Sequence, residues 1–210
     1  GDSAMCAAFN AGTDIHTVTA AKVFRVPEYM VTPEMRRHAK AVNFGIIYGI
    51  SEYGLAKDLG ISRARAREFI EGYFATYPGV KKYMNEAIET AKEKGYVQTL
   101  FGRRREVPEL KAANANQRAF GERVALNMPL QGTASDIIKL AMLNAAAKLK
   151  EGGYASRLIM QVHDELIIAA VPEEAEQMKK LLRDSMENVV QLKVKLEVEV
   201  GSGPNWLEAK

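Results

Sequence analysis

The sequence has almost no cysteine and no long hydrophobic run. Its 210 residues include one cysteine, Cys6, which excludes an internal disulfide and a zinc site built on several cysteines. A single free thiol is typical of proteins of the reducing cytosol. No apolar stretch approaches the ~18 residues of a membrane-spanning helix, and no signal peptide opens the chain. We therefore expect a cytoplasmic protein with no membrane partner.

The sequence is also poor in net charge, with 29 Lys and Arg against 26 Asp and Glu. The positive charges are unevenly placed, since residues 22–67 hold nine basic against four acidic side chains and residues 92–123 hold eight against four. This excess suits a surface that faces phosphates, although a solvated charged face would have the same composition. The length and the 47% hydrophobic content suit one large or two small globular domains. Because the chain opens with Gly1 and no initiator methionine, we expect a fragment of a longer protein.

The clearest local pattern predicts a helix from Thr32 to Gly49. Thr32 provides a capping oxygen, the proline after it has the backbone angle of a first helical residue, and Gly49 provides a stop. A polar and aromatic stripe recurs every four residues along this helix. It consists of Arg36, Lys40, Phe44 and Tyr48, whereas Ala39, Val42 and Ile46 lie on a different face suited to packing.

The stripe has the dimensions of a nucleotide. At about 1.5 Å per residue, Arg36 to Phe44 spans roughly 12 Å, which is about the length of a nucleoside triphosphate. Two cations would meet phosphates at one end, and an aromatic ring would meet a base or sugar at the other. An amphipathic helix with a solvated basic edge is the alternative interpretation.

The last third of the chain predicts a hairpin with two acids at its tip. Two apolar strands, at 157–162 and 166–171, flank His163-Asp164-Glu165. Acids are common in turns for local reasons, so the turn alone leaves a structural role open. An amphipathic helix is predicted over 172–190, and the strict alternation of 192–200 predicts a further strand. The order helix–strand–strand–helix–strand predicts an α+β fold with an antiparallel sheet.

Several motifs together resemble the family A DNA polymerases, the bacterial DNA polymerase I type. Arg36-x3-Lys40-x7-Tyr48-Gly49 is similar to motif B, the helix that closes over the incoming nucleotide in that family. The run QVHDEL, residues 161–166, is similar to motif C. Asn127-x-Pro-x-Gln131-Gly132 resembles the segment beside the primer terminus, and the chain ends with a family-like Gly201-x-Gly203-x-Asn205-Trp206. The resemblance covers essentially all 210 residues.

The resemblance implies a role for each site residue. Asp164 would bind magnesium, with two Mg²⁺ ions in the complete site, and Glu165 would assist it; Lys40 completes the catalytic set. A nucleotide-binding role falls to Arg36, Lys40, Phe44 and Tyr48, and to His16 in an Asp-Ile-His-Thr setting, although a lone histidine is more often structural. At position 44 the family associates Phe with rejection of dideoxynucleotides and Tyr with their acceptance. DNA contacts would come from Arg103, Arg104, Arg105, Arg123, Asn127, Gln131 and His163. For the run of three arginines, the alternative is a solvated turn. For Arg123, Asn127 and Gln131, the alternative is that they cap a helix or are solvated.

The implied organisation is a helical fingers subdomain plus a partial palm. Residues 1–25 would lead from palm to fingers, 26–125 would form the fingers, and 126–210 would form the C-terminal half of the palm. The family's motif A is nowhere in this chain, so its metal-binding aspartate and the glutamate that excludes ribose are missing. The thumb and any exonuclease domain are missing as well.

The function implied is template-directed DNA synthesis from dNTPs on primer–template DNA, by a two-metal mechanism, in a bacterial cytoplasm at the nucleoid. The missing N-terminal part of the polymerase would be a necessary partner, and the isolated chain is expected to be inactive. Two alternatives remain. A single-subunit RNA polymerase shares the motif B helix, although Phe44 and the HDE turn disfavour it. A DNA- or nucleotide-binding fragment without catalysis is the other.

Overall fold

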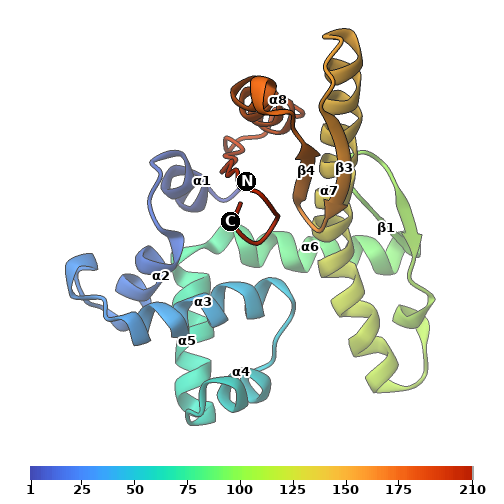
Figure 1. Cartoon of the computed structure of the whole chain (residues 1–210). Helices are drawn as coiled ribbons and strands as arrows, with labels where there is room; N and C mark the ends of the chain where they lie inside the picture. The colour runs from blue at the N-terminus through green and yellow to red at the C-terminus, as the bar shows by residue number, and fades with distance from the viewer. Residues whose placement is uncertain (210) are drawn as a thin grey trace. The chain divides into compact units, whose positions relative to one another are not determined.

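The computed structural model describes residues 1–209 and is mostly helical (Figure 1). It divides into two compact units, of which the first is Gly1–Leu130 and the second begins at Gln131. None of the helices within residues 1–209 combines the length and the apolar character that crossing a membrane requires. The α+β class expected from the sequence is confirmed, with short antiparallel hairpins beside the helices.

Helices form most of the first unit, and their ends follow the capping residues. These helices are α1 (Ser3–Asn10), α2 (Ile15–Phe24), α3 (Pro33–Ile47), α4 (Glu52–Leu59), α5 (Arg63–Thr76) and α6 (Pro78–Lys94), with a 3₁₀ turn η1 (Glu28–Met30) between α2 and α3. The side chains of Asp2, Asp14, Thr32, Ser51 and Ser62 each accept a backbone N–H at a helix start. Helices α4 and α6 end at Gly60 and Gly95, which have the left-handed conformation that favours glycine.

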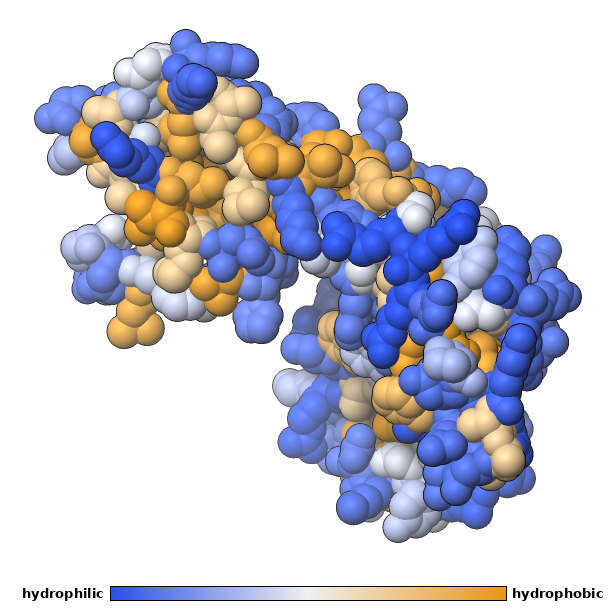
Figure 2. Space-filling view, turned by 90° about the vertical axis from the view of Figure 1, so that its right-hand side faces the viewer, coloured by the Kyte–Doolittle hydropathy of each residue, from blue (hydrophilic) through white to orange (hydrophobic). Residues whose placement is uncertain are grey.

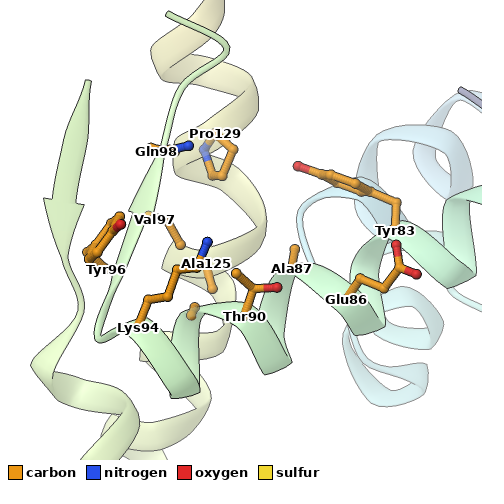
Figure 3. Close-up of a pocket in the computed structure, with 11 residues that line it drawn as sticks. Tyr83, Glu86, Ala87, Thr90, Lys94, Tyr96, Val97, Gln98, Ala125 and Pro129 are labelled. Carbon is orange, nitrogen blue, oxygen red and sulfur yellow. The ribbon is translucent and has the colours of Figure 1, made fainter. Parts of the chain in front are cut away.

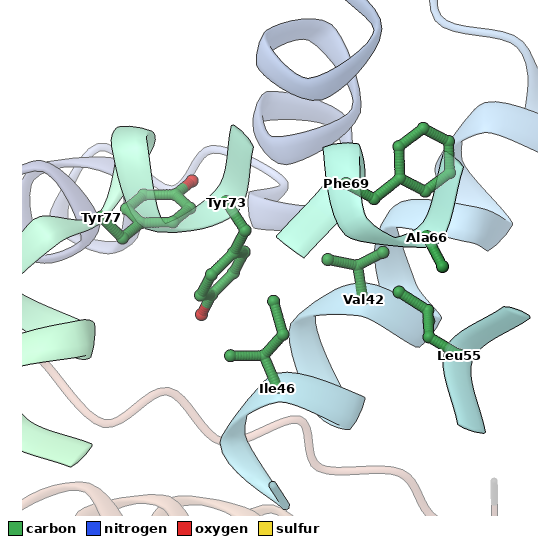
Figure 4. Close-up of a cluster of buried hydrophobic side chains, with 7 residues drawn as sticks. All are labelled: Val42, Ile46, Leu55, Ala66, Phe69, Tyr73 and Tyr77. Atoms are coloured by element: carbon green, nitrogen blue, oxygen red, sulfur yellow. The ribbon is translucent and has the colours of Figure 1, made fainter. Parts of the chain in front are cut away.

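The core cluster that holds α3 lies between α3, α4 and α5 (Figure 4). Val42 and Ile46 of α3 pack with Leu55 of α4, and with side chains of α5 and the residue after it, namely Ala66, Phe69, Tyr73 and Tyr77. A hydrogen bond of 3.2 Å joins the hydroxyls of Thr19 and Tyr77 inside this core. Because α3 is anchored by its buried face, its opposite face is held toward solvent.

A small hairpin and the first part of a long helix complete the first unit. Strands β1 (Tyr96–Gln98) and β2 (Arg104–Glu106) pair antiparallel, and a 3₁₀ turn η2 (Pro108–Lys111) follows. Helix α7 then runs from Ala115 to Glu151 without interruption. The sequence around Pro129 is compatible with a helix start, since proline favours the first turn, but the structure corrects this interpretation because Pro129 lies inside α7. Proline costs a helix one backbone donor, and fourteen residues of helix already precede it here, so its preference for a first turn did not decide where α7 begins.

The second unit contains the acidic hairpin. Strands β3 (Arg157–Val162) and β4 (Glu165–Ala169) pair antiparallel with Val162 opposite Glu165. A 3₁₀ turn η3 (Pro172–Glu174) and helix α8 (Ala175–Glu187) follow. Buried side chains of α7, β4 and α8 form its core, namely Ile138, Ala141, Ala145, Leu149, Leu166, Met178 and Leu181. The hairpin and the amphipathic helix after it are thus confirmed.

The strand predicted over residues 192–200 is not formed. These residues keep the expected alternation, with Val194, Leu196 and Val198 half-buried and the charged residues between them exposed. A strand also needs a neighbour for its backbone groups, and within residues 1–209 β3 and β4 pair only with each other. The alternation of residues therefore predicts which side chains are buried, but it does not predict backbone pairing with a neighbouring strand.

Apolar side chains remain exposed in the second unit. Leu143 of α7 is 63% exposed and Ile159 of β3 is 61% exposed. Figure 2 shows, on the face that it presents, hydrophobic residues gathered in patches between hydrophilic ones. The division into lead-in helices (1–25), fingers (26–125) and palm (126–210) stays a prediction.

Candidate nucleotide-binding and catalytic residues

The stripe predicted on α3 faces solvent. Arg36, Lys40, Phe44 and Tyr48 are exposed, Phe44 by 45% and Tyr48 by 39%, while the packing face of the same helix is buried. The rings of Phe44 and Tyr48 lie nearly parallel, with centroids 6.5 Å apart. Exposed aromatic rings on a soluble helix are available for stacking, and here they stand two turns and more beyond Arg36. The predicted separation of an exposed stripe from a buried packing face is thus confirmed for this helix, while the nucleotide contact stays a prediction.

Arg36 has a carboxylate partner that the motif did not predict. Its Nε donates to Asp14 Oδ2 at 2.5 Å. Asp14 also caps α2 by accepting the His16 N–H at 3.0 Å, and it accepts the Thr17 hydroxyl at 2.7 Å. The Arg36 guanidinium, aided by these donors, holds the pKa of the Asp14 carboxyl well below its usual range. An anion that binds Arg36 would therefore compete with Asp14.

His16 lies between the polar and aromatic parts of this face. Its Nδ1 is 2.9 Å from Asn43 Nδ2, and its ring centroid is 5.7 Å from that of Phe44. Partial burial lowers the pKa of His16, and the positive charges of Arg36 and Lys40 lower it further, while Asp14 opposes them. The side chain is thus neutral near pH 7 and aligned next to the predicted nucleotide stripe.

The predicted DNA-contacting arginines of the first unit are exposed. Arg103, Arg104 and Arg105 follow the β1–β2 turn, and the Arg104 guanidinium lies 4.6 Å from the Tyr96 ring centroid. On α7, Arg123 is exposed and Asn127 is half-buried, with its amide oxygen buried. Gln131, one turn further along α7, is exposed. Their DNA contacts stay predictions.

A pocket of about 300 Å³ in the first unit is separate from these residues (Figure 3). It lies between α6, β1 and α7, and its wall is mostly apolar with polar groups such as Glu86, Lys94 and Gln98. None of the predicted site residues lines it. The pocket is therefore distinct from the predicted nucleotide site.

The acidic turn of the second unit is a tight β3–β4 connection. His163 has a φ of 52°, a left-handed conformation uncommon outside glycine, and its carbonyl accepts the Gln161 side-chain amide at 2.6 Å. Asp164 is exposed at the tip. Glu165 begins β4 and accepts the Trp206 indole N–H at 3.0 Å. Among residues 1–209, no three His, Cys, Asp or Glu side chains gather closely enough to hold a metal ion.

The family model "DNA polymerase family A" matches residues 1–208. The chain belongs to DNA polymerase family A. It is 52% identical to DNA polymerase I of Geobacillus stearothermophilus and 53% identical to DNA polymerase I of Bacillus subtilis, in each case over all of this chain. It spans about a quarter, 24%, of the length of these curated relatives.

A solved polymerase structure has the same fold. The polymerase domain of Pol1 from M. smegmatis, described as a complex with DNA primer-template and dNTP, is 44% identical and superposes with a TM-score of 0.95. The match covers 99% of this chain and 37% of that one. The resemblance read from motifs B and C is thereby confirmed at the level of family and fold.

Reasoning from sequence missed the partners of the site residues. The Asp-Ile-His-Thr setting gives no sign that its aspartate, Asp14, is the partner of Arg36, which is 22 residues away. Asn43 lies within the motif B segment and bonds His16, a contact that the motif does not predict. Trp206 was noted only as part of a terminal motif. Their polar character was the available signal, but nothing local in the sequence shows which groups meet.

Proposed function

We propose that this chain provides, within a whole polymerase, the nucleotide-binding helix and part of the catalytic site for template-directed DNA synthesis. The observation that carries the proposal is the exposed stripe on α3, with Arg36 and Lys40 at one end and Phe44 and Tyr48 at the other. In a family A member, such a face is suited to a dNTP lying along the helix.

The residues of the stripe would share the nucleotide between them. Arg36 and Lys40 would bind the triphosphate and offset the charge that develops on the leaving pyrophosphate. Phe44 and Tyr48 would contact the sugar and base by stacking. His16, neutral and bonded to Asn43, would approach the phosphates from α2. This division of labour follows the order of charged and aromatic groups along α3.

Magnesium is the cofactor that this function implies, and Asp164 is the residue of this chain that would hold it. Mg²⁺ takes oxygen ligands, commonly one or two carboxylates plus water and substrate phosphates, and Asp164 presents an exposed carboxylate. Two ions, when bound, supply stabilisation of the attacking and leaving oxygens, as is general in polymerases. Since residues 1–209 contain no three-ligand cluster, a further carboxylate would come from the rest of the polymerase.

The primer–template would contact the basic and polar residues outside the stripe. Arg103, Arg104 and Arg105 are exposed on one hairpin and would bind backbone phosphates without reading sequence. Arg123, Asn127 and Gln131 of α7, and His163 beside the acidic turn, would contact nucleotides near the primer end. A polymerase with this substrate would act at the nucleoid in the bacterial cytoplasm.

A second candidate function is nucleotide and DNA binding without catalysis by this chain alone. It is favoured by the absence of a three-ligand metal cluster in residues 1–209. Both functions agree if the chain binds its substrates and becomes catalytic only with the rest of the polymerase.

Primer extension with Mg²⁺ tests the proposal. The chain alone should not extend a primer, and addition of the upstream polymerase fragment in trans should restore extension if the two pieces dock. The variant Asp164→Asn tests the metal site, because it removes the predicted ligand charge with little change in side-chain size. It should abolish the restored activity. Robust extension by the chain alone, or full activity of Asp164→Asn in the restored enzyme, would contradict the proposed site.

A further inference from the structure

The C-terminal segment brings one side chain to the acidic hairpin. The indole N–H of Trp206 donates to Glu165 Oε2 across 3.0 Å, joining residues that are 41 positions apart. Trp206 is 40% exposed and Glu165 is half-buried, so the bond lies at the edge of the second unit. An N–H bond to an ionised carboxylate is stronger than a neutral one and restricts the orientation of the carboxylate.

The turn around Trp206 is held by its neighbour Asn205. The Asn205 side-chain oxygen accepts the backbone N–H of Glu208 at 3.1 Å, and its amide donates to the Glu208 carboxylate at 2.6 Å. The Asn205 carbonyl accepts the Ala209 N–H at 3.1 Å. These three bonds close one helical turn, and this turn carries the indole.

Two glycines allow the segment to fold back on this turn. A Cβ on Gly201 would lie 1.8 Å from the Ala209 carbonyl oxygen, and a Cβ on Gly203 would lie 2.7 Å from the Glu208 carbonyl carbon. Side chains do not approach backbone atoms so closely, so only glycine fits at both positions. The pattern Gly201-x-Gly203-x-Asn205-Trp206 therefore builds a compact support for the indole.

The Glu165 end of the bond is also held. Glu165 pairs with Val162 in the β3–β4 register, and Leu166 beside it is buried. The His163 carbonyl at the tip is fixed by the Gln161 side chain at 2.6 Å. The backbone is thus held on both sides of the acidic turn, and the indole bond restricts the rotamer of the Glu165 side chain as well.

We propose that Trp206 is a positioning residue that fixes the Glu165 carboxylate next to Asp164, and that the C-terminal turn exists to present it. The use of this contact in the reaction rests on the proposed function, in which Glu165 assists Asp164. Without the indole N–H, the Glu165 side chain loses one of the contacts that hold its rotamer, and the fraction of molecules with the productive arrangement falls.

Fluorescence tests the contact without any catalysis. Trp206 is the only tryptophan in the 210-residue chain, so selective excitation reports on it alone. Glu165→Leu should shift its emission to the red and raise its acrylamide quenching constant, whereas Glu165→Gln, which keeps an acceptor oxygen, should leave both near the wild-type values. The matched control is Glu197→Leu, at an exposed glutamate of the same unit, and circular dichroism should show unchanged helix content throughout. Equal spectra for Glu165→Leu and Glu197→Leu would overturn the proposal.

A double-mutant cycle in the whole polymerase tests the use of the contact. Trp206→Phe should lower kcat about tenfold, the size of a lost hydrogen bond to a charged group, with KM for dNTP unchanged. The double variant Trp206→Phe with Glu165→Leu should be no slower than Glu165→Leu alone, because Trp206 acts through Glu165. If kcat of the double variant instead falls by the product of the two single effects, Trp206 acts independently of Glu165, and the positioning role is overturned. If Glu165→Leu itself leaves extension unchanged, the assumed role of Glu165 fails, while the fluorescence result still decides whether Trp206 fixes it.

Discussion

Replacement of Asp14 by Asn should strengthen nucleotide binding without disrupting the fold. In the structure Asp14 bonds Arg36 Nε at 2.5 Å, the Thr17 hydroxyl at 2.7 Å and the His16 N–H at 3.0 Å. Asparagine retains an oxygen for the cap of α2 and has an ordinary cap preference. It removes the negative charge that competes with a triphosphate for Arg36.

The exposure of the pair sets the size of the effect. The Arg36 and Asp14 side chains are 48% and 39% exposed, and ion pairs of such exposure contribute ~0–1 kcal/mol. The dNTP Kd should therefore fall measurably, by up to about fivefold, which corresponds to about 1 kcal/mol. The free energy of unfolding should fall by no more than the same amount. The gain should shrink at high salt, because the Debye length falls from ~10 Å at 0.1 M to ~3 Å at 1 M.

The assay is the dNTP dependence of single-turnover incorporation by the whole polymerase, at low and high salt. Asp58→Asn is the matched control, since it removes an exposed carboxylate from α4, away from the stripe. An unchanged Kd would refute the competition between Asp14 and the triphosphate. A larger Kd, meaning weaker dNTP binding, would show the reverse, that Asp14 holds Arg36 in the orientation in which it binds phosphate.

Three further outcomes are expected from the same face. Lys40→Ala should weaken dNTP use by ~1.5–3 kcal/mol, as for a lost hydrogen bond to a charged group, with primer–template affinity nearly unchanged; equal losses in both titrations would argue against a triphosphate contact. Phe44→Tyr should raise incorporation of dideoxynucleotides relative to deoxynucleotides in a competition assay, and an unchanged ratio would contradict the assigned sugar contact. The lowered pKa of His16 means that the fold favours its neutral form. Its contribution to the free energy of unfolding is therefore complete above pH 6.5, the ordinary pKa of histidine, and is lost as the pH falls through the folded-state pKa. Urea unfolding of wild type and His16→Asn across that range should show wild type losing relative stability on acidification, and parallel curves would refute this.

Helix ends and the faces of elements were predictable because they depend on neighbours in sequence. Thr32 caps α3 from three residues before the N–H that it accepts, and the four-residue stripe follows from the helical repeat alone. The β3–β4 hairpin was predictable in the same way, since two apolar runs flank a short polar turn. Even the segment 192–200, which forms no strand, keeps the alternation that its sequence indicates.

Only the tertiary structure decided which groups meet. Arg36 finds Asp14 because α2 packs against α3, and Glu165 finds Trp206 because the C-terminal turn folds back to the hairpin. Such partners are separated by 22 and 41 residues, and no local periodicity encodes them. The same holds for pairing in a sheet: residues 192–200 have the side-chain pattern of a strand, but a ladder needs a second backbone in register, and packing alone determines whether one is there.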